Sequence, residues 1–519
     1  MRRYILSGEQ SRLVDSYCIN TMGIPSVVLM ERAALTVVER LQELHKETDT
    51  YYIVCGTGNN GADGLAVARM LDDLQYSVAV GIIGDIQKAT KEFQIQLEIL
   101  KNTAVDWEVL TEDTVSFSRY SWVIDGIFGI GLSREVSGRY RAVIEQLNRS
   151  DCKVMAIDIP SGLHADTGIP MGVAVQADET VTFGNYKLGH KLGFGKDYCG
   201  NVLVATIGFR REAYANLLDR EEPLRECFAD GKPLITMPGR MQASHKGTFG
   251  KVAVIAGIGQ MPGAAFFAAK AAYLCGAGLV KVITAEDNTA IMKTNLPEAL
   301  TYGISKEMNW QETVKQLLGD CKAIIIGPGF GTDAFAEDLL AWTLQEHAKE
   351  FSDIPVVMDA DALNIMAKNR DLFQYLNKQY IITPHLLEMA RLLQVEKEQM
   401  MQTPLSYAEE FVKDYHCTCV LKSATTIVAS MDTHFQTYIN LTGNSGMAKG
   451  GSGDVLAGMI GGMLAQMKEI PLAAQLCVWL HGKAGDLAAG ERTEYSVLAS
   501  DLLNYIPRAI AYTIDAYMH

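Results

Sequence analysis

The stretch YYIVCGTGNNGADGLAVARML, residues 51–71, has the pattern of a strand, a glycine-rich turn and a helix. Short apolar stretches rich in β-branched residues recur along the next 140 positions and are separated by helix-like or loop segments; they lie at 76–83, 121–125, 153–158, 179–183 and 201–207. This alternation predicts a mostly parallel sheet with helices on both faces. We expect helices before the first strand, because Ser7 and Gln10 have the spacing of a capping box.

A second α/β series follows. Its expected strands lie at 251–257, 279–284, 322–327, 355–359, 380–383 and 419–422, and a helix follows from about 453. Between the two series, residues 210–245 are more charged, contain three prolines and read as a linker or docking arm. No fixed-period repeat relates the halves. We therefore expect two different α/β domains, over 1–215 and 241–519, joined by a linker over 216–240.

The composition is that of a globular protein, with 519 residues, 48% of them hydrophobic and 21% charged. The net charge of −15 argues against a nucleic-acid or membrane partner held by bulk charge. The ten cysteines include no CxxC pair and no zinc-ligand spacing, which favours a reduced, cytoplasmic protein. The first ten residues lack the apolar stretch of a signal peptide, and the longest uncharged apolar stretch, 455–467, is too short to span a bilayer.

Residues 56–61, Gly-Thr-Gly-Asn-Asn-Gly, match the GxGxxG pattern of dinucleotide-binding turns, and Asp85 lies about where a ribose-binding acid would fall. Glycines let a phosphate approach the backbone, and a helix N-terminus offers free N–H groups. A lone GxGxxG is a weak signal. The two asparagines and Asp63 are unusual for a plain dinucleotide turn, because such side chains can bind a ligand or cation themselves.

Polar residues also end two other strands of this half, at Asp125 and at Asp158, and Ser161 follows shortly after. The carboxyl ends of parallel strands meet at one edge of a sheet, so these side chains and Asn60 are expected to converge in one crevice. Oxygen donors of this kind suit a hard cation. The alternative is that Asp125 and Asp158 only cap the loops that follow them.

The segments CGTGNNGADGLAVAR, DGIFGIGLSREVSG and AIDIPSGLHADTG resemble the NAD(P)H-hydrate epimerase family, over roughly residues 1–215. The resemblance implies a Rossmann-like three-layer fold, a bound K+ ion and interconversion of the R and S epimers of hydrated NAD(P)H. It implies that K+ is held by Asn60, Asp125 and Ser161. It places the hydrated nucleotide against Asn59, Asn60, Gly61, Ala62, Asp63, Gly129, Ile130, Gly131, Leu132, Ser133, Arg134, Glu135 and Asp158.

This sequence departs from the family at Ala62, where a second glycine is usual, and at Thr57, which is often proline. Alanine is small enough for binding to survive. Asp158 is our candidate for acid–base catalysis, and Lys187 is a candidate helper.

In the second half, the stretch NSGMAKGGSGD, residues 444–454, leads directly into the helix-like VLAGMIGGMLAQM. Glycines before a helix expose amides that can stabilise charge on a transferring phosphoryl group. Asp454, expected at the first helical position, is placed to take a proton from a substrate hydroxyl. The alternative is a glycine-rich helix start with an aspartate favoured by the helix dipole. There is no GxxxxGK[ST] pattern, so a P-loop is excluded.

Residues 235–519 resemble the ADP/ATP-dependent NAD(P)H-hydrate dehydratase family of the ribokinase-like superfamily, through KGTFGKVAVIAG, MPGAA, GPGFGTD, VVMDADALN, TPHLLEMARLL, LKSATT and NSGMAKGGSGDVLAG. The resemblance implies that the hydrated nucleotide contacts Ala264, Gly329, His385 and Asp454. It places the adenine nucleotide against Lys422, Ser423, Ala424, Thr425, Thr426 and Gly453. Taken alone, His385 is more often a loop or capping histidine. Ser423 replaces a usual glycine.

Together the resemblances imply a bifunctional repair enzyme for NADHX and NADPHX, the hydrated forms of NADH and NADPH. One half epimerises the hydrate. The other dehydrates the S form with ADP and Mg2+ and releases AMP and phosphate. The residues do not distinguish ADP from ATP; the two-domain fusion resembles prokaryotic members, which favours ADP. Proteins of this superfamily often assemble, so a homo-oligomer is possible.

Three alternatives remain from the sequence. The second half could be a ribokinase-like small-molecule kinase that keeps its phosphorylated product. The first half could be a nucleotide-binding or docking module without activity. A dehydrogenase is disfavoured by the asparagines of the turn and by the lack of an evident site for hydride transfer.

Overall fold

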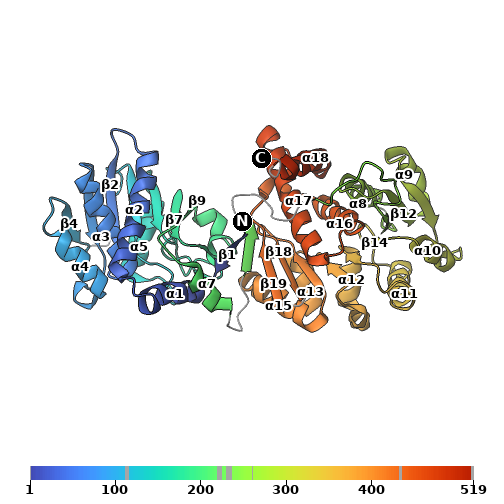
Figure 1. Cartoon of the computed structure of the whole chain (residues 1–519), viewed down its shortest axis with the longest axis horizontal. Helices are drawn as coiled ribbons and strands as arrows, with labels where there is room; N and C mark the ends of the chain where they lie inside the picture. Colours follow the sequence, from blue (N-terminus) through green and yellow to red (C-terminus); the bar gives the residue numbers. More distant parts are fainter. Residues whose placement is uncertain are drawn as a thin grey trace. The chain divides into compact units, whose positions relative to one another are not determined.

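The computed structural model describes residues 2–111, 116–218, 225–228, 237–259, 261–431 and 435–515. The chain forms two compact units, Tyr4–Leu224 and Arg225–His519 together with Met1–Arg3 (Figure 1). Positions 219–224 and 229–236 of the expected linker lie outside the described residues. All ten cysteines are free thiols. Among the described residues, no helix has the length and apolar character needed to cross a membrane.

The N-terminal unit is built on a sheet whose neighbouring strands are all parallel, as the sequence predicts. The strand order is β4 (Asp106–Val109), β3 (Ser77–Ile82), β2 (Thr50–Cys55), β5 (Trp122–Gly126), β6 (Lys153–Ile157), β7 (Glu179–Phe183) and β9 (Asn201–Ala205). Successive side chains of β2 enter two different cores: Tyr51 and Ile53 pack on one face of the sheet, and Tyr52 and Val54 on the other. Both faces are therefore covered, which makes the unit a three-layer α/β structure.

Helices α2 (Ser26–Leu44), α3 (Asn59–Asp73) and α4 (Lys91–Leu100) cover one face of this sheet, and α5 (Gly138–Asn148) covers the other. The remaining elements of this unit are β1 (Arg2–Leu6), α1 (Gly8–Ser16), η1 (Tyr17–Thr21), η2 (Ile86–Lys88), β8 (Tyr186–Lys187), η3 (Leu188–His190), α6 (Gly195–Tyr198) and α7 (Arg211–Leu218).

The expectation that the chain opens with helices is wrong, because the strand β1 precedes α1. This strand pairs in parallel with β8, matching Ile5 to Tyr186 and Leu6 to Lys187. A five-residue strand that begins with two arginines has no periodic pattern of its own, and its partner lies 181 positions away. The capping box at the start of α1 is confirmed, since Ser7 and Gln10 exchange both hydrogen bonds.

The C-terminal unit has a longer sheet. Its strand order is β13 (Leu300–Ile304), β12 (Leu279–Ala285), β11 (Lys251–Ile255), β14 (Ala323–Ile326), β15 (Val356–Met358), β16 (Tyr380–Ile382), β17 (Thr418–Leu421), β18 (Ile427–Met431), β19 (Phe435–Ile439) and β10 (Arg225–Phe228). The pairs from β13 to β17 are parallel, β17–β18 and β18–β19 are antiparallel, and β10 is parallel to β19. The α/β class expected for both halves is confirmed.

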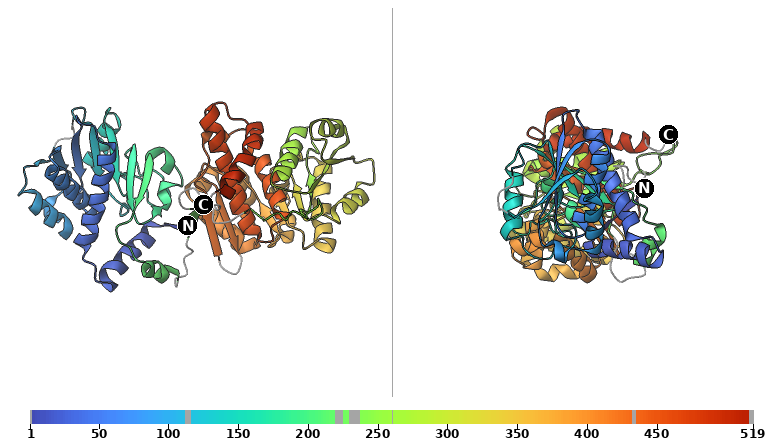
Figure 2. Two further views of the ribbon diagram at one scale, coloured as in Figure 1. Left: turned by 45° about the horizontal axis from the view of Figure 1, so that its top comes forward. Right: turned by 90° about the vertical axis from the view of Figure 1, so that its left-hand side faces the viewer.

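Helices cover both faces of this second sheet (Figure 2). On one face lie α8 (Pro262–Leu274), α16 (Ser452–Leu464), α17 (Ile470–Arg492) and α18 (Ala499–Asp515), and on the other lie α11 (Ala334–Glu350), α12 (Asp361–Lys368), α13 (Leu386–Leu393) and α15 (Pro404–Tyr415). Further short elements are η5 (Glu286–Asn288), α9 (Thr289–Asn295), α10 (Trp310–Leu318), η6 (Arg370–Tyr375), α14 (Lys397–Gln402) and η7 (Ser445–Met447).

Close packing of α16 against α8 positions the second glycine-rich loop. A Cβ atom at Gly458 would lie 2.2 Å from the carbonyl oxygen of Ala268, and one at Gly462 would lie 2.4 Å from that of Ala272. Only glycine permits this approach. The N-terminus of α16 is thereby held at a fixed place beside the carboxyl end of the parallel strands.

Candidate active sites

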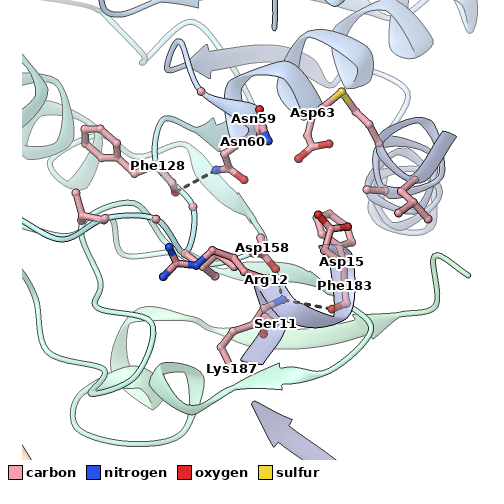
Figure 3. Close-up of a pocket in the computed structure, with 18 of the residues that line it drawn as sticks. Ser11, Arg12, Asp15, Asn59, Asn60, Asp63, Phe128, Asp158, Phe183 and Lys187 are labelled. Carbon is pink, nitrogen blue, oxygen red and sulfur yellow. Dashed lines mark hydrogen bonds and ion pairs between the residues drawn. The ribbon is translucent and has the colours of Figure 1, made fainter. Parts of the chain in front are cut away.

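A cavity of about 820 Å³ opens in the N-terminal unit, where the loops that follow β2 and β5 meet helix α1 (Figure 3). Of the residues expected to contact the hydrated nucleotide, those that line the cavity are Asn59, Asn60, Asp63, Gly129, Ile130, Gly131, Leu132, Ser133, Arg134 and Asp158. Gly61, Ala62 and Glu135 are not among the lining residues. A Cβ at Gly61 would lie 1.7 Å from the carbonyl oxygen of Gly56, so this glycine lets the helix pack against the turn. Ala62 is buried and Glu135 is exposed.

Asn60 and Phe128, which line the cavity, also belong to a buried oxygen cluster with Asp125 and Ser161. The Asp125 carboxylate accepts hydrogen bonds from the Ser161 backbone N–H at 2.7 Å and from the Ser161 hydroxyl at 2.5 Å. The Asn60 amide donates to the Phe128 carbonyl oxygen at 3.0 Å, and the Phe128 N–H donates to the Ser161 hydroxyl at 2.8 Å. The three residues expected to hold K+ are therefore brought together in one cluster.

Burial raises the pKa of Asp125 to about 6, although the hydrogen bonds from Ser161 and from the Ile127 N–H oppose that rise. Neither residue of the Asp125–Ser161 pair exposes any surface. Among the described residues, no group of three or more His, Cys, Asp or Glu side chains is placed to hold a metal. The donors of this cluster are instead a carboxylate, a hydroxyl, an amide and a backbone carbonyl, all of which offer oxygen.

Asp158 forms an ion pair with Lys187 inside the cavity. Its carboxylate also accepts a hydrogen bond from the Thr182 hydroxyl at 2.8 Å, and the Lys187 ammonium donates to the same hydroxyl at 2.8 Å. Burial is the largest single influence and would raise the pKa of Asp158, but the charge and hydrogen bond of Lys187, together with His190 and Thr182, outweigh it and the pKa is lowered. The backbone of Asp158 has φ +66°, a left-handed conformation that is rare for a residue other than glycine. Its carbonyl oxygen lies 2.8 Å from His190 Nε2.

Helix α1 contributes cavity residues that the sequence analysis missed, namely Ser11, Arg12 and Asp15. Figure 3 shows Asp15 beside the cavity, on the same side as Asp63. Charged residues on a short amphipathic helix carry no signal of a site in one sequence, because a solvated face looks the same. Asp85 does not line the cavity; it caps the short helix η2 by accepting from the Gln87 N–H at 3.0 Å.

In the C-terminal unit, α16 begins at Ser452, so Asp454 is the third helical residue and not the first. Gly451 precedes the helix with φ +94°, the left-handed conformation that favours glycine. A Cβ at Gly453 would lie 3.1 Å from the Lys422 ammonium nitrogen, which shows how closely the two approach. Lys422 in turn forms an ion pair with Asp359 at 2.6 Å.

The electrostatics of this site keep Asp454 easily protonated. Burial raises the pKa of Asp454 to about 7, and the negative charge of Asp359 adds to the rise while Lys422 opposes it. Burial also raises the pKa of Glu388 to about 7. Asp359 and Asp361 follow β15 in the sequence, but no role was assigned to them there, and Glu388 was missed. The sequence signal that could have identified Asp359 and Asp361 is their position directly after the buried strand β15. Glu388 lies in the first turn of α13, the helix that follows β16.

Two of the residues expected to contact the hydrated nucleotide, Ala264 and Gly329, lie next to each other. Gly329 has φ +58°, and a Cβ there would lie 2.9 Å from the Ala264 Cβ and 2.7 Å from the Met261 carbonyl oxygen. The next turn is fixed by Asp361, whose carboxylate accepts from the Gly331 N–H at 2.8 Å.

His385 acts as the N-cap of α13. Its Nδ1 accepts hydrogen bonds from the N–H groups of Leu387 at 3.1 Å and Glu388 at 3.2 Å. A neutral ring with Nδ1 as acceptor carries its proton on Nε2, which is thus a donor. Burial lowers the pKa of His385, and the charge of Lys422 lowers it further, so the neutral ring is favoured. The backbone N–H of Lys422 donates to the Pro384 carbonyl at 2.8 Å and holds the two loops side by side.

The loop from Lys422 to Thr426, expected to contact the adenine nucleotide, is a tight turn between β17 and β18. The Ser423 hydroxyl donates to the Thr425 carbonyl oxygen at 2.7 Å and accepts from the Thr425 N–H at 3.3 Å. Ser423 and Ala424 are exposed, and Thr425 is buried. Serine in place of the usual glycine therefore has a local role, because its hydroxyl closes the turn.

Comparison with known proteins gives matches to both halves of the chain. The family model described as NAD(P)H-hydrate dehydratase matches residues 252–508, and the one described as YjeF-related protein N-terminus matches residues 26–189. Among solved structures, the ADP/ATP-dependent NAD(P)H-hydrate dehydratase from Bacillus subtilis, co-crystallized with ATP/Mg2+, is 30% identical, covers 54% of this chain and 95% of its own, and has a TM-score of 0.45.

Two relatives span nearly the whole chain. The bifunctional NAD(P)H-hydrate repair enzyme of Vibrio cholerae is 33% identical over 506 residues, covering 96% of each chain. The enzyme of the same name from Moorella thermoacetica is 34% identical over 522 residues, covering 97% of this chain and 96% of its own. Because this identity extends over nearly its whole length, the chain belongs to the family of bifunctional NAD(P)H-hydrate repair enzymes.

Proposed function

We propose that this chain repairs hydrated NADH and NADPH. The N-terminal domain, residues 1–215, interconverts the R and S hydrates, and the C-terminal domain, residues 241–519, dehydrates the S hydrate at the expense of ADP. The observation that carries the proposal is that one chain holds two such sites. One is a cavity lined by Asn60 and Asp158, next to the buried Asp125–Ser161 pair, and the other is a glycine-rich helix start that presents Asp454. A dehydratase that accepts one epimer leaves the other behind, so an epimerase in the same chain completes the repair.

In the dehydratase site, Asp454 is the general base. Its pKa of about 7 leaves a large fraction ionised at neutral pH while keeping it basic enough to accept a hydroxyl proton. As Asp454 takes this proton, the hydroxyl oxygen of the hydrate attacks the terminal phosphorus of ADP, and AMP leaves. The electron pair of the ring nitrogen then forms a C=N bond as the C–O bond breaks and phosphate leaves. Loss of a proton from the neighbouring ring carbon restores NAD(P)H.

The surrounding residues stabilise the charge that develops on the phosphoryl group. The amides of Gly451 to Gly453 lie at the N-terminus of α16, where the helix dipole favours negative charge. Lys422 lies beside Gly453 and adds a cation. Carboxylates such as Asp359 and Asp454 are the ligand type that Mg2+ prefers, in company with phosphate oxygens and water. Bound with ADP, Mg2+ would supply further positive charge there.

In the epimerase site, the buried oxygen cluster fits K+. Asp125 is a fully buried carboxylate, and its described contacts are N–H and O–H donors and no cation. A monovalent cation held by oxygens of Asn60, Asp125 and Ser161 would balance that charge. When bound, K+ would supply a fixed positive charge beside the cavity, and Asp158, held by Lys187, would exchange protons with the hydrate.

The test is recovery of reduced-nicotinamide absorbance from a mixture of R and S NADH hydrates, with ADP, Mg2+ and K+ present. Recovery of both epimers, faster than their spontaneous exchange, is the expected result. Recovery of the S share alone would leave the dehydratase and remove the epimerase. A stable phosphate ester without NADH, with ADP and again with ATP, would show a kinase instead.

A further inference from the structure

Four carboxyl groups line the cavity of the N-terminal unit, and three of them, Asp15, Asp63 and Asp158, differ in their surroundings. Asp158 is held by Lys187 and Thr182. Asp63, on α3, and Asp15, on α1, form no hydrogen bond or ion pair with another side chain in the part of the chain that is described. Figure 3 shows Asp63 above and Asp158 below, with Asp15 at the side of the cavity between them. The structure thus places one cation-bound carboxylate and two without a cation around one space.

These surroundings separate the protonation states of the carboxyl groups. Burial raises the pKa of Asp63 well above its ordinary value, and the negative charges of Asp158 and Asp15 raise it further. Burial and the charge of Asp158 also raise the pKa of Asp15, whereas Lys187 opposes the rise. The pKa of Asp158 is lowered. A pair of carboxyl groups pushed apart in this way supplies an acid and a base at the same pH.

Other ionisable side chains line the cavity and are not among the charges that shift the pKa of Asp63 or Asp15. They are Arg12, Glu92, Arg134 and Tyr140. Glu92 accepts a hydrogen bond from the Ser26 hydroxyl at 3.0 Å, and Arg12 donates to the Gly8 carbonyl at 3.3 Å. The charges that act on Asp63 are those of Asp158 and Asp15.

The chemistry of the hydrate requires both an acid and a base. Its hydroxyl sits on a ring carbon bonded to nitrogen, and hydroxide is a poor leaving group. Protonation of that hydroxyl lets the C–O bond break as the nitrogen electron pair forms a C=N bond, and one water leaves. Inversion is complete when one water adds to the other face, gives up a proton, and the electron pair returns to nitrogen.

We propose that Asp63 is the general acid that protonates the departing hydroxyl, that Asp158 is the general base for the water that adds, and that Asp15 keeps Asp63 protonated. This inference rests on the proposed epimerase function and extends it. One proton is given by Asp63 and one is taken by Asp158, so the proton returns to Asp63 between turnovers. In the S-to-R reaction the roles are reversed, so that Asp158 starts protonated and Asp63 starts ionised.

The first test is Asp63→Asn, assayed as exchange between purified R and S NADH hydrates. We expect the kcat of epimer exchange to fall about 10²–10⁴-fold, the usual contribution of a positioned acid or base, with KM nearly unchanged. Asp73→Asn is the matched control, because it makes the same substitution on the same helix at a carboxyl whose side chain is 67% exposed. Dehydration of pure S hydrate by the other unit of the same protein checks its concentration and integrity.

The second test is Asp15→Asn, read as the pH profile of kcat. Removing the negative neighbour lowers the pKa of Asp63, so activity is lost at a lower pH on the alkaline side. If Asp63→Asn fails to fold, this shift of the alkaline limb still tests whether Asp63 is the general acid. Exchange by Asp63→Asn within threefold of wild type, or an unshifted alkaline limb in Asp15→Asn, would overturn the assignment. Failure of the wild type to exchange the epimers would instead refute the proposed function itself.

Discussion

Replacing Lys187 by methionine should destabilise the N-terminal unit, because it leaves the buried Asp158 without its cation. Lys187 is 3% exposed, and its ammonium donates to Asp158, to the Thr182 hydroxyl at 2.8 Å and to the Phe183 carbonyl at 3.3 Å. Removing one partner of a buried ion pair costs about 3–5 kcal/mol of unfolding free energy. At 1.36 kcal/mol for each tenfold change, that cost predicts opening of this unit about 10²–10⁴ times more often.

The assay is hydrogen–deuterium exchange followed by mass spectrometry, since peptides from each unit are read separately. We expect faster exchange in peptides of residues 4–218 and unchanged exchange in peptides of residues 237–515, which serve as the internal control. The double variant Lys187→Met/Asp158→Asn should recover most of the protection, because no charge is then left buried. Wild-type exchange rates in the single variant at pH 7 would refute the reasoning.

The pH dependence of this effect has a definite sign. In the wild type the pKa of Asp158 is lowered, so its ion pair stabilises the fold above the ordinary carboxyl pKa, and that contribution is lost as the pH falls through the lowered value. Without Lys187, burial leaves the pKa of Asp158 raised. The destabilisation of the variant should therefore shrink as the pH falls through this raised value and the carboxyl becomes neutral.

Four further results are expected. Asp454→Asn should lower dehydration of S hydrate about 10²–10⁴-fold and leave epimer exchange unchanged, measured as NADH formation and as epimer ratio. Because burial raises the pKa of Asp454 to about 7, wild-type dehydration should increase as the pH rises through that value, and a rate that falls over this range would exclude Asp454 as the base. Gly61→Ala should destabilise the N-terminal unit by about 1–3 kcal/mol, the usual cost of overpacking, because its Cβ would lie 1.7 Å from the Gly56 carbonyl oxygen. A lower melting temperature of this unit would show the destabilisation. Asp125→Asn should remove the K+ dependence of epimer exchange, which a titration with K+ measures; an unaltered dependence would place the cation elsewhere.

Much of the N-terminal site follows from strand ends that local sequence reveals. Asp125 lies at the carboxyl end of β5, Asn60 and Ser161 follow β2 and β6, and parallel strands end at one edge of a sheet. The hydrogen bonds that join these residues therefore follow from a pattern readable in the sequence. The capping role of His385 is also predictable from the sequence, because an N-cap depends only on the residue and the helix that directly follows it.

Other site residues depend on contacts between distant segments. Asp15 reaches the cavity because β1 pairs with β8 and carries α1 to that place, and this pairing joins residues some 180 positions apart. Glu388, on α13, belongs to the second site because the charges of Lys422 and Asp359, which follow two different strands, act on it. No periodicity in the sequence encodes such pairs.

The sequence by itself determined the class of both halves, the glycine turns and the strand ends, because backbone geometry and hydrophobic periodicity are local properties. Only the tertiary structure decided which carboxyl groups share a space and which of them has a cation. Lys187 pairs with Asp158 and lowers its pKa, whereas burial and the charges of Asp158 and Asp15 raise the pKa of Asp63, although all of these are simply charged residues in the sequence. The physical reason is that a pKa depends on burial and on neighbouring charges through space, and both are set by long-range packing.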